Sequence, residues 1–472
     1  MSVNKEEIRK SIEEWFERHS DEMIKDLGRL LAINSVKGPA EDGAPYGKGP
    51  RAALDAVCAM LEERGFSVDN FEDMIITAQI GPYPPLMGIL AHVDVVGVGD
   101  GWDTDPFEMT VKDGKIYGRG ATDNKGPSIA AMYAMYCARD LCPELRSGFQ
   151  LLLGSGEEVG CLDIARYLEV NTPPPNVFTP DAGYPVVNTE KGRITPFFSA
   201  SWEKSTELPR VVSITGGSTT NIVPDRATAV VEGFSISELE RYCREYSEKT
   251  GASISADEGG GKCTIVAQGV STHAASPDSG NNAQTALLEM LAAMPFAKSG
   301  GFDCIRSLNR LFPHGDYFGH ALGIAMGDEL SGNLTVNFGV LGFTEIDFTA
   351  NFDSRTPICA DDVDLLGIVQ AAFDREGITM TNNTLSRSHH TPEDSLFVQT
   401  LLGIYEDYTG NTRECLASGG QTYVHEITGG VAFGSAMPGV DNLIHGVNEF
   451  IGVDQLIVSA KMFAQSILEM CS

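Results

Sequence analysis

A short apolar segment that ends in two acids constrains the fold of this chain more than any other feature. Residues 149–153 (Phe-Gln-Leu-Leu-Leu) predict a buried strand, and the turn Gly154-Ser155-Gly156 then presents Glu157 and Glu158. Adjacent glutamates are more often a solvated pair on a helix, as Glu13-Glu14 illustrates. A carboxylate at the end of a buried strand is costly unless it is paired or binds a cation. The segment therefore predicts a sheet whose strand ends carry a polar site.

The order of predicted elements divides the chain into two domains. Up to residue 187, helical segments such as 128–139 alternate with strand-like segments such as 86–91, which is the pattern of a sheet with crossover helices. From 193 to 385, strands rich in Thr and Val predominate, which indicates an α+β insertion. The first pattern then returns. We therefore predict an α/β domain of residues 1–189 and 386–472, interrupted by a domain of residues 190–385.

Composition excludes several classes of partner. The net charge is −31 and no basic run occurs, so nucleic-acid binding, which needs clustered Lys and Arg, is not expected. No segment approaches the ~18 consecutive apolar residues of a membrane span, and the N-terminal segment lacks the apolar core of a signal peptide. The ten cysteines are scattered without a Cys-x-x-Cys pair, which indicates reduced thiols. We expect a cytoplasmic protein with neither a nucleic-acid nor a membrane partner.

Further histidines and acids follow other strand-like segments. His92 and Asp94 follow the apolar segment 86–91, and alternation along a strand points them to the same side. The alternative for an isolated His-x-Asp pattern is a core histidine bonded to a nearby acid. A glycine-rich turn presents Asp123 directly before a predicted helix, and the alternative for this turn is a helix N-cap, a role that Asp123 or Asn124 could serve.

Two more candidates complete this set. Asp181 follows the apolar pair Val177-Phe178 at a distance of a few residues, and His445 lies near the C-terminus, directly after Leu443-Ile444. No single motif is specific, but together they supply two histidines and several carboxylates. This combination of ligand types suits Zn²⁺ or a similar divalent ion.

In this order the motifs resemble those of the M20 metallopeptidase family, and within it the PepV-like branch of dipeptidases. The resemblance spans nearly the whole chain and is most specific outside the insertion. It implies a zinc-peptidase-like catalytic domain, in which helices flank a mixed sheet, and an inserted α+β lid domain. The motifs are His92-Val93-Asp94, residues 100–107 with Gly118-Arg119-Gly120, residues 123–126, Gly156-Glu157-Glu158, Pro180-Asp181 and His445.

The same resemblance implies a site for two Zn²⁺ per chain, with Mn²⁺ or Co²⁺ as alternatives. Asp123 would bridge the two ions, and each ion would also bind one histidine and one further carboxylate, namely His92 with Asp181 and His445 with Glu158. Glu157 would remain without a metal, as the general base that takes the proton of the attacking water. Asp94 would hold the ring of His92, and the peptide bond after Asp123 would be cis.

The resemblance also implies a set of substrate contacts. His273 resembles the family's histidine that steadies the developing oxyanion, whereas its alternative is a surface-loop residue. Asn221 and Arg355 match positions that bind the substrate's terminal carboxylate, although Arg355 taken alone indicates a salt-bridged strand residue. Ser418 and Gly419 belong to a glycine-rich loop that resembles a further carboxylate contact, and whose alternative is a simple turn.

Two positions depart from the family pattern. Relatives often have a second Asp after the bridging one, whereas this chain has Asn124, which removes a negative charge but should keep the turn. After the glycine-rich loop, this chain has His425 where related dipeptidases tend to have Arg. The substrate contacts near that loop therefore do not carry over directly.

These inferences predict metal-dependent hydrolysis of the peptide bond of dipeptides, that is, of small peptides with a free C-terminal carboxylate. An N-acyl amino acid deacylase or desuccinylase of the same family is the alternative, which the long insertion disfavours. A catalytically dead binding protein is a further alternative, which the complete set of ligands, base and His273 disfavours. By the same resemblance we expect a monomer, with a homodimer as the alternative.

Overall fold

The chain forms two compact units. The computed structural model describes residues 5–382 and 384–472. The first unit takes in the described residues up to Thr189, together with His389–Leu416 and Gln421–Ser472, and the second takes in Glu190–Ser388 and Ala417–Gly420.

The division differs from the predicted one at two places. The chain leaves the second unit after Ser388, three residues later than the predicted boundary at 385/386. The later boundary arises because Leu385 and Ser386 pair with strand residues Ile194 and Arg193 of the second unit. Residues 417–420 also belong to the second unit, since the amide of Lys191 donates to the carbonyl of Ser418 at 2.9 Å.

The first unit is built on a nine-stranded sheet. Strands β6, β3, β7 and β24 run parallel to one another, whereas β1 with β2, β2 with β6, and β24 with β9 are antiparallel. The sheet is therefore mixed, as predicted. In spatial order its strands are β1 (Val68–Phe71), β2 (Ile75–Ile80), β6 (Gly148–Gly154), β3 (Pro85–His92), β7 (Asn176–Thr179), β24 (Val431–Ala432), β9 (Val186–Glu190) and β22 (His389–His390), and β23 (Cys415–Ser418) also pairs with β9.

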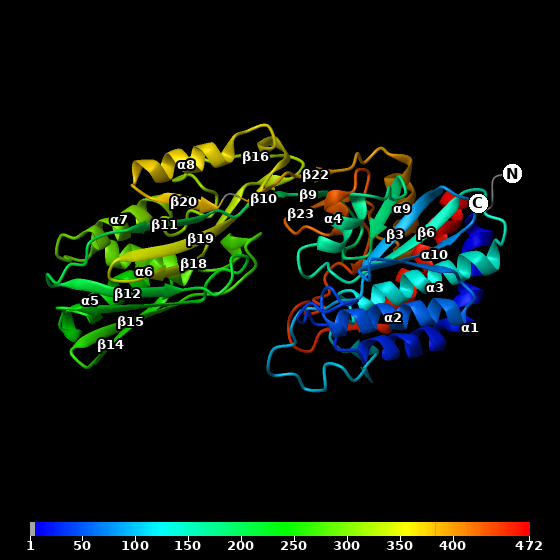
Figure 1. Ribbon diagram of the computed structural model, residues 1–472, viewed down its shortest axis with the longest axis horizontal. Coiled ribbons are helices and arrows are strands. Elements are labelled where there is room, and N and C mark those ends of the chain that lie inside the picture. Colours follow the sequence, from blue (N-terminus) through cyan, green and yellow to red (C-terminus); the bar gives the residue numbers. More distant parts are fainter. Residues whose placement is uncertain (1–4, 383) are drawn as a thin grey trace. The chain divides into compact units, whose positions relative to one another are not determined.

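Helices cover both faces of this sheet. Leu151 and Leu153 of β6 pack into a core with the long helices of the unit, whereas Leu152 packs on the opposite face against α4 (Leu162–Leu168). Burial on both faces explains why the parallel strands read as continuous apolar runs. Figure 1 shows α1 (Lys5–Leu31), α2 (Lys48–Glu63) and α3 (Lys125–Leu141) side by side. The other long helices of this core are α9 (Leu396–Thr409) and α10 (Val453–Cys471).

Two small sheets hold loops that carry predicted site residues. Strand β5 (Lys115–Tyr117) pairs on one side with β4 (Thr110–Lys112) and on the other with β26 (Phe450–Gly452). This pairing brings the segment before Asp123 beside the segment after His445. Strand β8 (Ala182–Gly183), next to Asp181, pairs with β25 (Ser435–Ala436).

The second unit is an α+β structure, as predicted for the insertion. Its ten-stranded sheet is antiparallel and packs against the helices α5 (Ile236–Thr250), α6 (Ala283–Ala293), α7 (Gly300–Leu311) and α8 (Leu365–Arg375). The strands are β14 (Ser253–Gly259), β15 (Lys262–Gln268), β13 (Arg226–Glu232), β12 (Arg210–Gly216), β18 (Thr335–Phe343), β19 (Asp347–Thr356), β10 (Gly192–Ile194) and β21 (Leu385–Ser386) in spatial order, with β11 (Phe197–Ser201) and β20 (Thr379–Asn382) beside β19.

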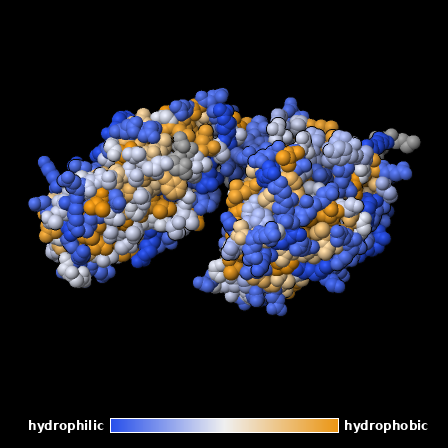
Figure 2. Space-filling model, in the orientation of Figure 1, coloured by the Kyte–Doolittle hydropathy of each residue, from blue (hydrophilic) through white to orange (hydrophobic). Residues whose placement is uncertain are grey.

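On the face shown in Figure 2, hydrophilic side chains are spread over both units, and hydrophobic ones are interspersed among them. Within residues 5–382 and 384–472, no helix has the length and apolar character needed to cross a membrane.

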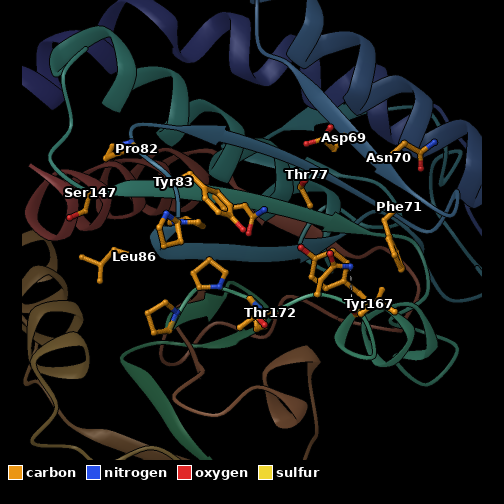
Figure 3. Close-up of a pocket in the computed structure, with 18 of the residues that line it drawn as sticks. Asp69, Asn70, Phe71, Thr77, Pro82, Tyr83, Leu86, Ser147, Tyr167 and Thr172 are labelled. Carbon is orange, nitrogen blue, oxygen red and sulfur yellow. Dashed lines mark hydrogen bonds between the residues drawn. The ribbon is translucent and has the colours of Figure 1, made fainter.

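A cavity of about 990 Å³ lies in the first unit at the amino ends of β3, β6 and β7 (Figure 3). Its walls include Tyr83 before β3, Ser147 before β6 and Pro175 before β7. The predicted metal ligands instead follow the carboxyl ends of the same strands, and no predicted site residue lines this cavity. A cavity of this volume therefore does not by itself identify the candidate site.

Candidate metal centre

The predicted metal ligands and the predicted base gather at one edge of the first unit's sheet. His92 is the last residue of β3, and the turn with Glu157 and Glu158 follows the neighbouring strand β6. Asp181 follows β7, which pairs with β3 on the side opposite to β6. Asp123 lies two residues before the first residue of α3. Carboxyl ends of adjacent parallel strands meet at one edge of a sheet, which is where ligand sites of such folds form.

Asp123 lies between the two histidines. Its Oδ1 atom is 3.1 Å from Nε2 of His92, and its Oδ2 atom is 2.9 Å from Nε2 of His445. His92 Nε2 is also 3.5 Å from Oδ2 of Asp181, and His445 Nε2 is 3.3 Å from Oε1 of Glu158. The structure thus brings all five predicted ligands together.

The donor atoms form groups of three that lie close enough together to bind one metal ion. His92, Asp123 and Asp181 form one group, and Asp123, Glu158 and His445 form another, with donor atoms within 4.8 Å of one another in each. Both groups contain Asp123. In addition, His92 Nε2 and Glu158 Oε1 are buried and make no hydrogen bond with any described residue. Buried polar atoms that lack a hydrogen-bond partner fit a divalent cation, which would supply the missing partner.

Opposite charges hold the shared carboxylate ionised. Burial acts to raise the pKa of Asp123, but its contacts with His445 and His92 keep that pKa well below the usual range. Contacts with Asp123 and Glu158 raise the pKa of His445 to about 11. Burial would lower the pKa of His92, yet Asp181 and Asp123 raise it well above the ordinary value. A bound cation requires neutral imidazoles, so these protons must leave when it binds.

Glu157 differs from Glu158 in its surroundings. Burial, followed by the charge of Asp181, raises the pKa of Glu157 well above its ordinary value. Burial and the charge of Asp123 raise the pKa of Glu158 to about 7, although His445 counteracts both. Glu157 also belongs to a group of possible donors with His92 and Glu158, but to neither group that contains Asp123. A carboxyl group whose pKa is raised toward neutrality is suited to proton transfer.

Asp94 makes contacts that the sequence did not indicate. The nearer partner of His92 Nδ1 is the main-chain carbonyl of Asp94 at 3.0 Å, whereas the predicted carboxylate contact is 3.4 Å long. The Asp94 carboxylate instead accepts hydrogen bonds from the amides of Glu157 at 3.4 Å and Glu158 at 3.1 Å. The carboxylate therefore holds the acidic turn, and the main chain holds the imidazole.

Asn124, the first departure from the family pattern, contacts a predicted ligand. Its side-chain amide donates to Oδ1 of Asp181 and to the carbonyl of Pro180, each at 3.0 Å. It occupies the N-cap position of α3 without a side-chain cap hydrogen bond, which rules out the alternative capping role for it. The Asp123-Asn124 peptide bond is cis, which confirms that prediction.

Glu449 and Arg119 support the site, and sequence reasoning missed the role of Glu449. The fully buried Glu449 carboxylate accepts from the amides of Gly120, Thr122 and Asp123 at 2.9–3.0 Å and from Nη1 of Arg119 at 2.7 Å. Arg119 also donates to the carbonyl of Gly446, beside His445, at 2.8 Å. The pair therefore ties the Asp123 loop to the His445 loop. An acid directly before the apolar Phe450-Ile451 was the available signal.

The five predicted substrate-site residues all belong to the second unit. Arg355 is 4% exposed, donates from Nε to Asp353 at 2.6 Å, and donates from Nη1 to the carbonyl of Gly419 at 2.5 Å. Ser418 accepts at Oγ from the amide of Gly420 at 2.9 Å. These contacts bring the glycine-rich loop and Arg355 together. Arg355 also forms a salt bridge with Asp353, which is the alternative role that the sequence indicated for it.

Asn221 and His273 form a second group in that unit. Both side chains are exposed, the neighbouring residue Ile222 forms a β-bridge with His273, and the carbonyl of Asn221 accepts from the amide of Ala274 at 2.9 Å. A Cβ atom on Gly419 would lie 2.5 Å from that of Ala275, so the glycine-rich loop packs closely on this segment. The absence of a side chain at Gly419 permits that approach.

Known proteins match this chain over nearly its whole length. Residues 88–469 match peptidase family M20/M25/M40. "Putative dipeptidase YtjP" of Bacillus subtilis (strain 168) is 32% identical over 458 residues, which are 96% of this chain and 98% of that protein. "Beta-Ala-Xaa dipeptidase" of Lactobacillus delbrueckii subsp. lactis is 30% identical over 472 residues, which are 98% of either chain.

Solved structures share the fold at lower identity. Human carnosine dipeptidase 1 has a TM-score of 0.56 and 16% identity, over 98% of each chain. The dipeptidase Dug1p of Saccharomyces cerevisiae also has a TM-score of 0.56, with 12% identity over 100% of this chain and 99% of that one. At such identities the likeness shows a common fold and no more.

Proposed function

Because the chain belongs to peptidase family M20/M25/M40, and is thereby a metallopeptidase that hydrolyses peptide bonds, we propose that it is a dipeptidase with two zinc ions. The observation that carries the proposal is the position of Asp123, whose two carboxylate oxygens face His92 and His445 separately. A carboxylate that offers one oxygen to each of two donor groups suits a bridge between cations. Histidine and carboxylate donors favour Zn²⁺, and they also accept Mn²⁺ or Co²⁺.

The proposed mechanism assigns one proton-transfer role and several positioning roles. When bound, the two ions supply Lewis acidity and lower the pKa of water at the site. Glu157 accepts the proton of the attacking water and delivers it to the nitrogen of the leaving amine. Two observations support this role: its pKa is raised, and it lies outside both donor groups that contain Asp123. Asp94 holds the Glu157 amide, and His273 stabilises the oxyanion.

We propose dipeptides as substrates, bound through their free C-terminal carboxylate. Arg355, Ser418 and Gly419 lie together, and a guanidinium group can bind a carboxylate with two hydrogen bonds. Asn221, next to the His273 segment, would complete the contact. The names of two relatives that match nearly the whole chain support dipeptides over N-acyl amino acids.

A hydrolysis panel tests this function directly. Zinc-loaded protein is assayed with dipeptides, the corresponding tripeptides and N-acyl amino acids, and kcat/KM is compared across the three classes. We expect the dipeptides to be hydrolysed fastest. Faster hydrolysis of N-acyl amino acids would identify a deacylase, and no hydrolysis of any class in the loaded protein would indicate a binding protein.

A further inference from the structure

A buried carboxylate and a buried tyrosine lie behind the turn that carries the two glutamates. Asp163, near the start of α4, is fully buried, and its Oδ2 atom accepts from the amides of Ser155 at 2.9 Å and Gly156 at 2.8 Å. The hydroxyl of Tyr423, also fully buried, donates to the same oxygen at 2.5 Å. Hydrogen bonds to an ionised acceptor are about twice as strong as neutral ones.

The sequence of the turn is adapted to this contact. A Cβ atom on Gly154 would lie 2.2 Å from the Tyr423 hydroxyl and 2.5 Å from Oδ2 of Asp163. A Cβ atom on Gly156 would lie 2.8 Å from the ring of Tyr46 and 3.1 Å from Cγ of Asp163. A side chain at position 154 would therefore displace the acid or the tyrosine, and one at position 156 would first displace Tyr46. The approach of Asp163 and Tyr423 thus explains Gly154, whereas Gly156 is explained chiefly by the approach of Tyr46.

The amides of the whole turn bind buried carboxylates. Asp163 accepts from Ser155 and Gly156, while Asp94 accepts from Glu157 and Glu158. Asp94 lies two residues after His92, the last residue of β3, so the end of the turn with Glu157 and Glu158 is held from that strand. The other end depends on Asp163, whose hydrogen bond from Tyr423 comes from a distant part of the chain.

We propose that Asp163 and Tyr423 are positioning residues, which orient the backbone of residues 155–158 and so place the Glu157 carboxylate for proton transfer. This proposal rests on the proposed role of Glu157 as the base. Neither side chain belongs to a donor group around Asp123, and the ring of Tyr423, which Tyr423→Phe keeps, lies edge-on to that of His92 with centroids 6.1 Å apart. Their effect reaches Glu157 through the amides of Ser155 and Gly156.

The charge on Asp163 is the part of this arrangement that depends on pH. Burial and the nearby charge of Asp94 raise the pKa of Asp163 to about 6, whereas the hydroxyl of Tyr423 and the turn amides lower it. The other titratable groups that face it are Tyr46 and Cys161. Protonation would turn one acceptor oxygen into a donor, and a turn amide or the tyrosine would then lose its partner.

Tyr423→Phe tests the proposal because it removes a single oxygen atom. In zinc-loaded protein we expect kcat to fall by about tenfold or more, with little change in KM or zinc content. Loss of the hydroxyl raises the pKa of Asp163, so the acid limb of the kcat profile should move to higher pH. Activity should partly recover above that limb, where Asp163 is ionised.

Tyr184→Phe is the matched control. Tyr184 lies in the same unit, is 2% exposed and donates from its hydroxyl to Ser459 at 2.9 Å, away from the acidic turn. It should leave kcat and the pH profile unchanged. An unchanged kcat and acid limb in Tyr423→Phe would overturn the proposal, and so would a loss that is equal at every pH and accompanied by loss of zinc.

Amide hydrogen exchange separates this proposal from the proposed function. Exchange at residues 155–158 of the zinc-loaded protein without substrate should be faster in Tyr423→Phe than in Tyr184→Phe. This measurement needs no turnover, so it remains decisive even if the hydrolysis panel fails. Equal exchange in the two variants would show that Tyr423 does not hold the turn.

Discussion

The side-chain amide of Asn124 donates to one carboxylate oxygen of Asp181 and leaves the other oxygen facing His92. The hydrogen bond to Oδ1 is 3.0 Å long, and Oδ2 lies 3.5 Å from Nε2 of His92. Asn124 thus selects which oxygen of Asp181 is available to a cation. A carboxylate at position 124 could not donate this bond unless it were protonated.

Asn124→Asp should therefore make stability more dependent on metal. Two carboxylates in place of the amide–carboxylate pair repel each other, and a bound cation relieves that repulsion. We expect the melting temperature without metal to fall by about 2 °C or more and the rise on adding Zn²⁺ to exceed that of the unaltered protein. Differential scanning calorimetry with and without chelator measures both.

Asn188→Asp controls for the general cost of a buried acid. Asn188 is 1% exposed and donates to the carbonyl of Thr391 at 2.8 Å, without contacting a predicted ligand. This variant should lose stability equally with and without Zn²⁺. The same behaviour in Asn124→Asp would contradict the proposed contact with the metal site.

Replacement of Glu157 and of Glu158 should have different consequences. Glu157→Gln should lower kcat by about 10²-fold to 10⁴-fold, because it removes the proton acceptor, while zinc content stays unchanged. Glu158→Gln should lose one of the two ions. Elemental analysis after dialysis, combined with kcat, distinguishes the two. Glu14→Gln, on an exposed part of α1, is the control and should change neither.

Zinc binding should release protons. The pKa of His445 is raised to about 11 by its contacts with Asp123 and Glu158, and that of His92 is also raised, so both imidazoles are protonated at neutral pH before the ion binds. Apparent affinity should therefore rise as pH rises, with about one proton released per ion.

Titration calorimetry in buffers of different ionisation enthalpy measures this release. His445→Gln should reduce it, whereas His320→Gln, at an exposed position of the second unit, should not. Heats that do not depend on the buffer would refute the assignment. Chelation should abolish hydrolysis, and Zn²⁺, Mn²⁺ or Co²⁺ should restore it.

The contribution of Arg355 to kcat/KM should depend on the negative charge at the substrate's C-terminus. Amidation of that carboxylate should reduce kcat/KM of the unaltered protein far more than it reduces that of Arg355→Ala. Arg193→Ala is a close control, because Arg193 donates to the same Asp353 at 2.7 Å, whereas the carbonyl of Gly419 accepts from Arg355. If amidation costs Arg355→Ala as much as it costs Arg193→Ala, Arg355 does not bind the carboxylate.

The candidate ligands could be predicted from the sequence because their signal is local. An apolar strand that ends in His92, or in the turn before Glu157, is visible within a few residues, and the structure brings those strand ends together. The partners in the supporting contacts have no local signal. Glu449 lies 326 residues from Asp123, from whose amide it accepts a hydrogen bond, and Tyr423 lies 260 residues from Asp163. Only the folded sheet brings such partners together, and the position of Glu449 before the apolar Phe450-Ile451 does not indicate which residues it contacts.

The domain boundaries, too, can be predicted from the sequence only where the signal is local. The first crossing, at Thr189 and Glu190, coincides with a change in composition that the sequence displays. The membership of residues 417–420 in the second unit depends on Lys191 and Arg355, which are distant in sequence. No pattern within the loop itself indicates that membership.

The separate loop 417–420 has a consequence for the evolution and dissection of this protein. An inserted domain that is one continuous segment of the chain can be gained, lost or exchanged as a single piece. Here, excision of residues 190–388 would take Arg355 away from the carbonyl of Gly419 and would leave the loop on the host without the unit that it packs against. The second unit therefore cannot be transplanted intact by cutting the chain at one pair of points.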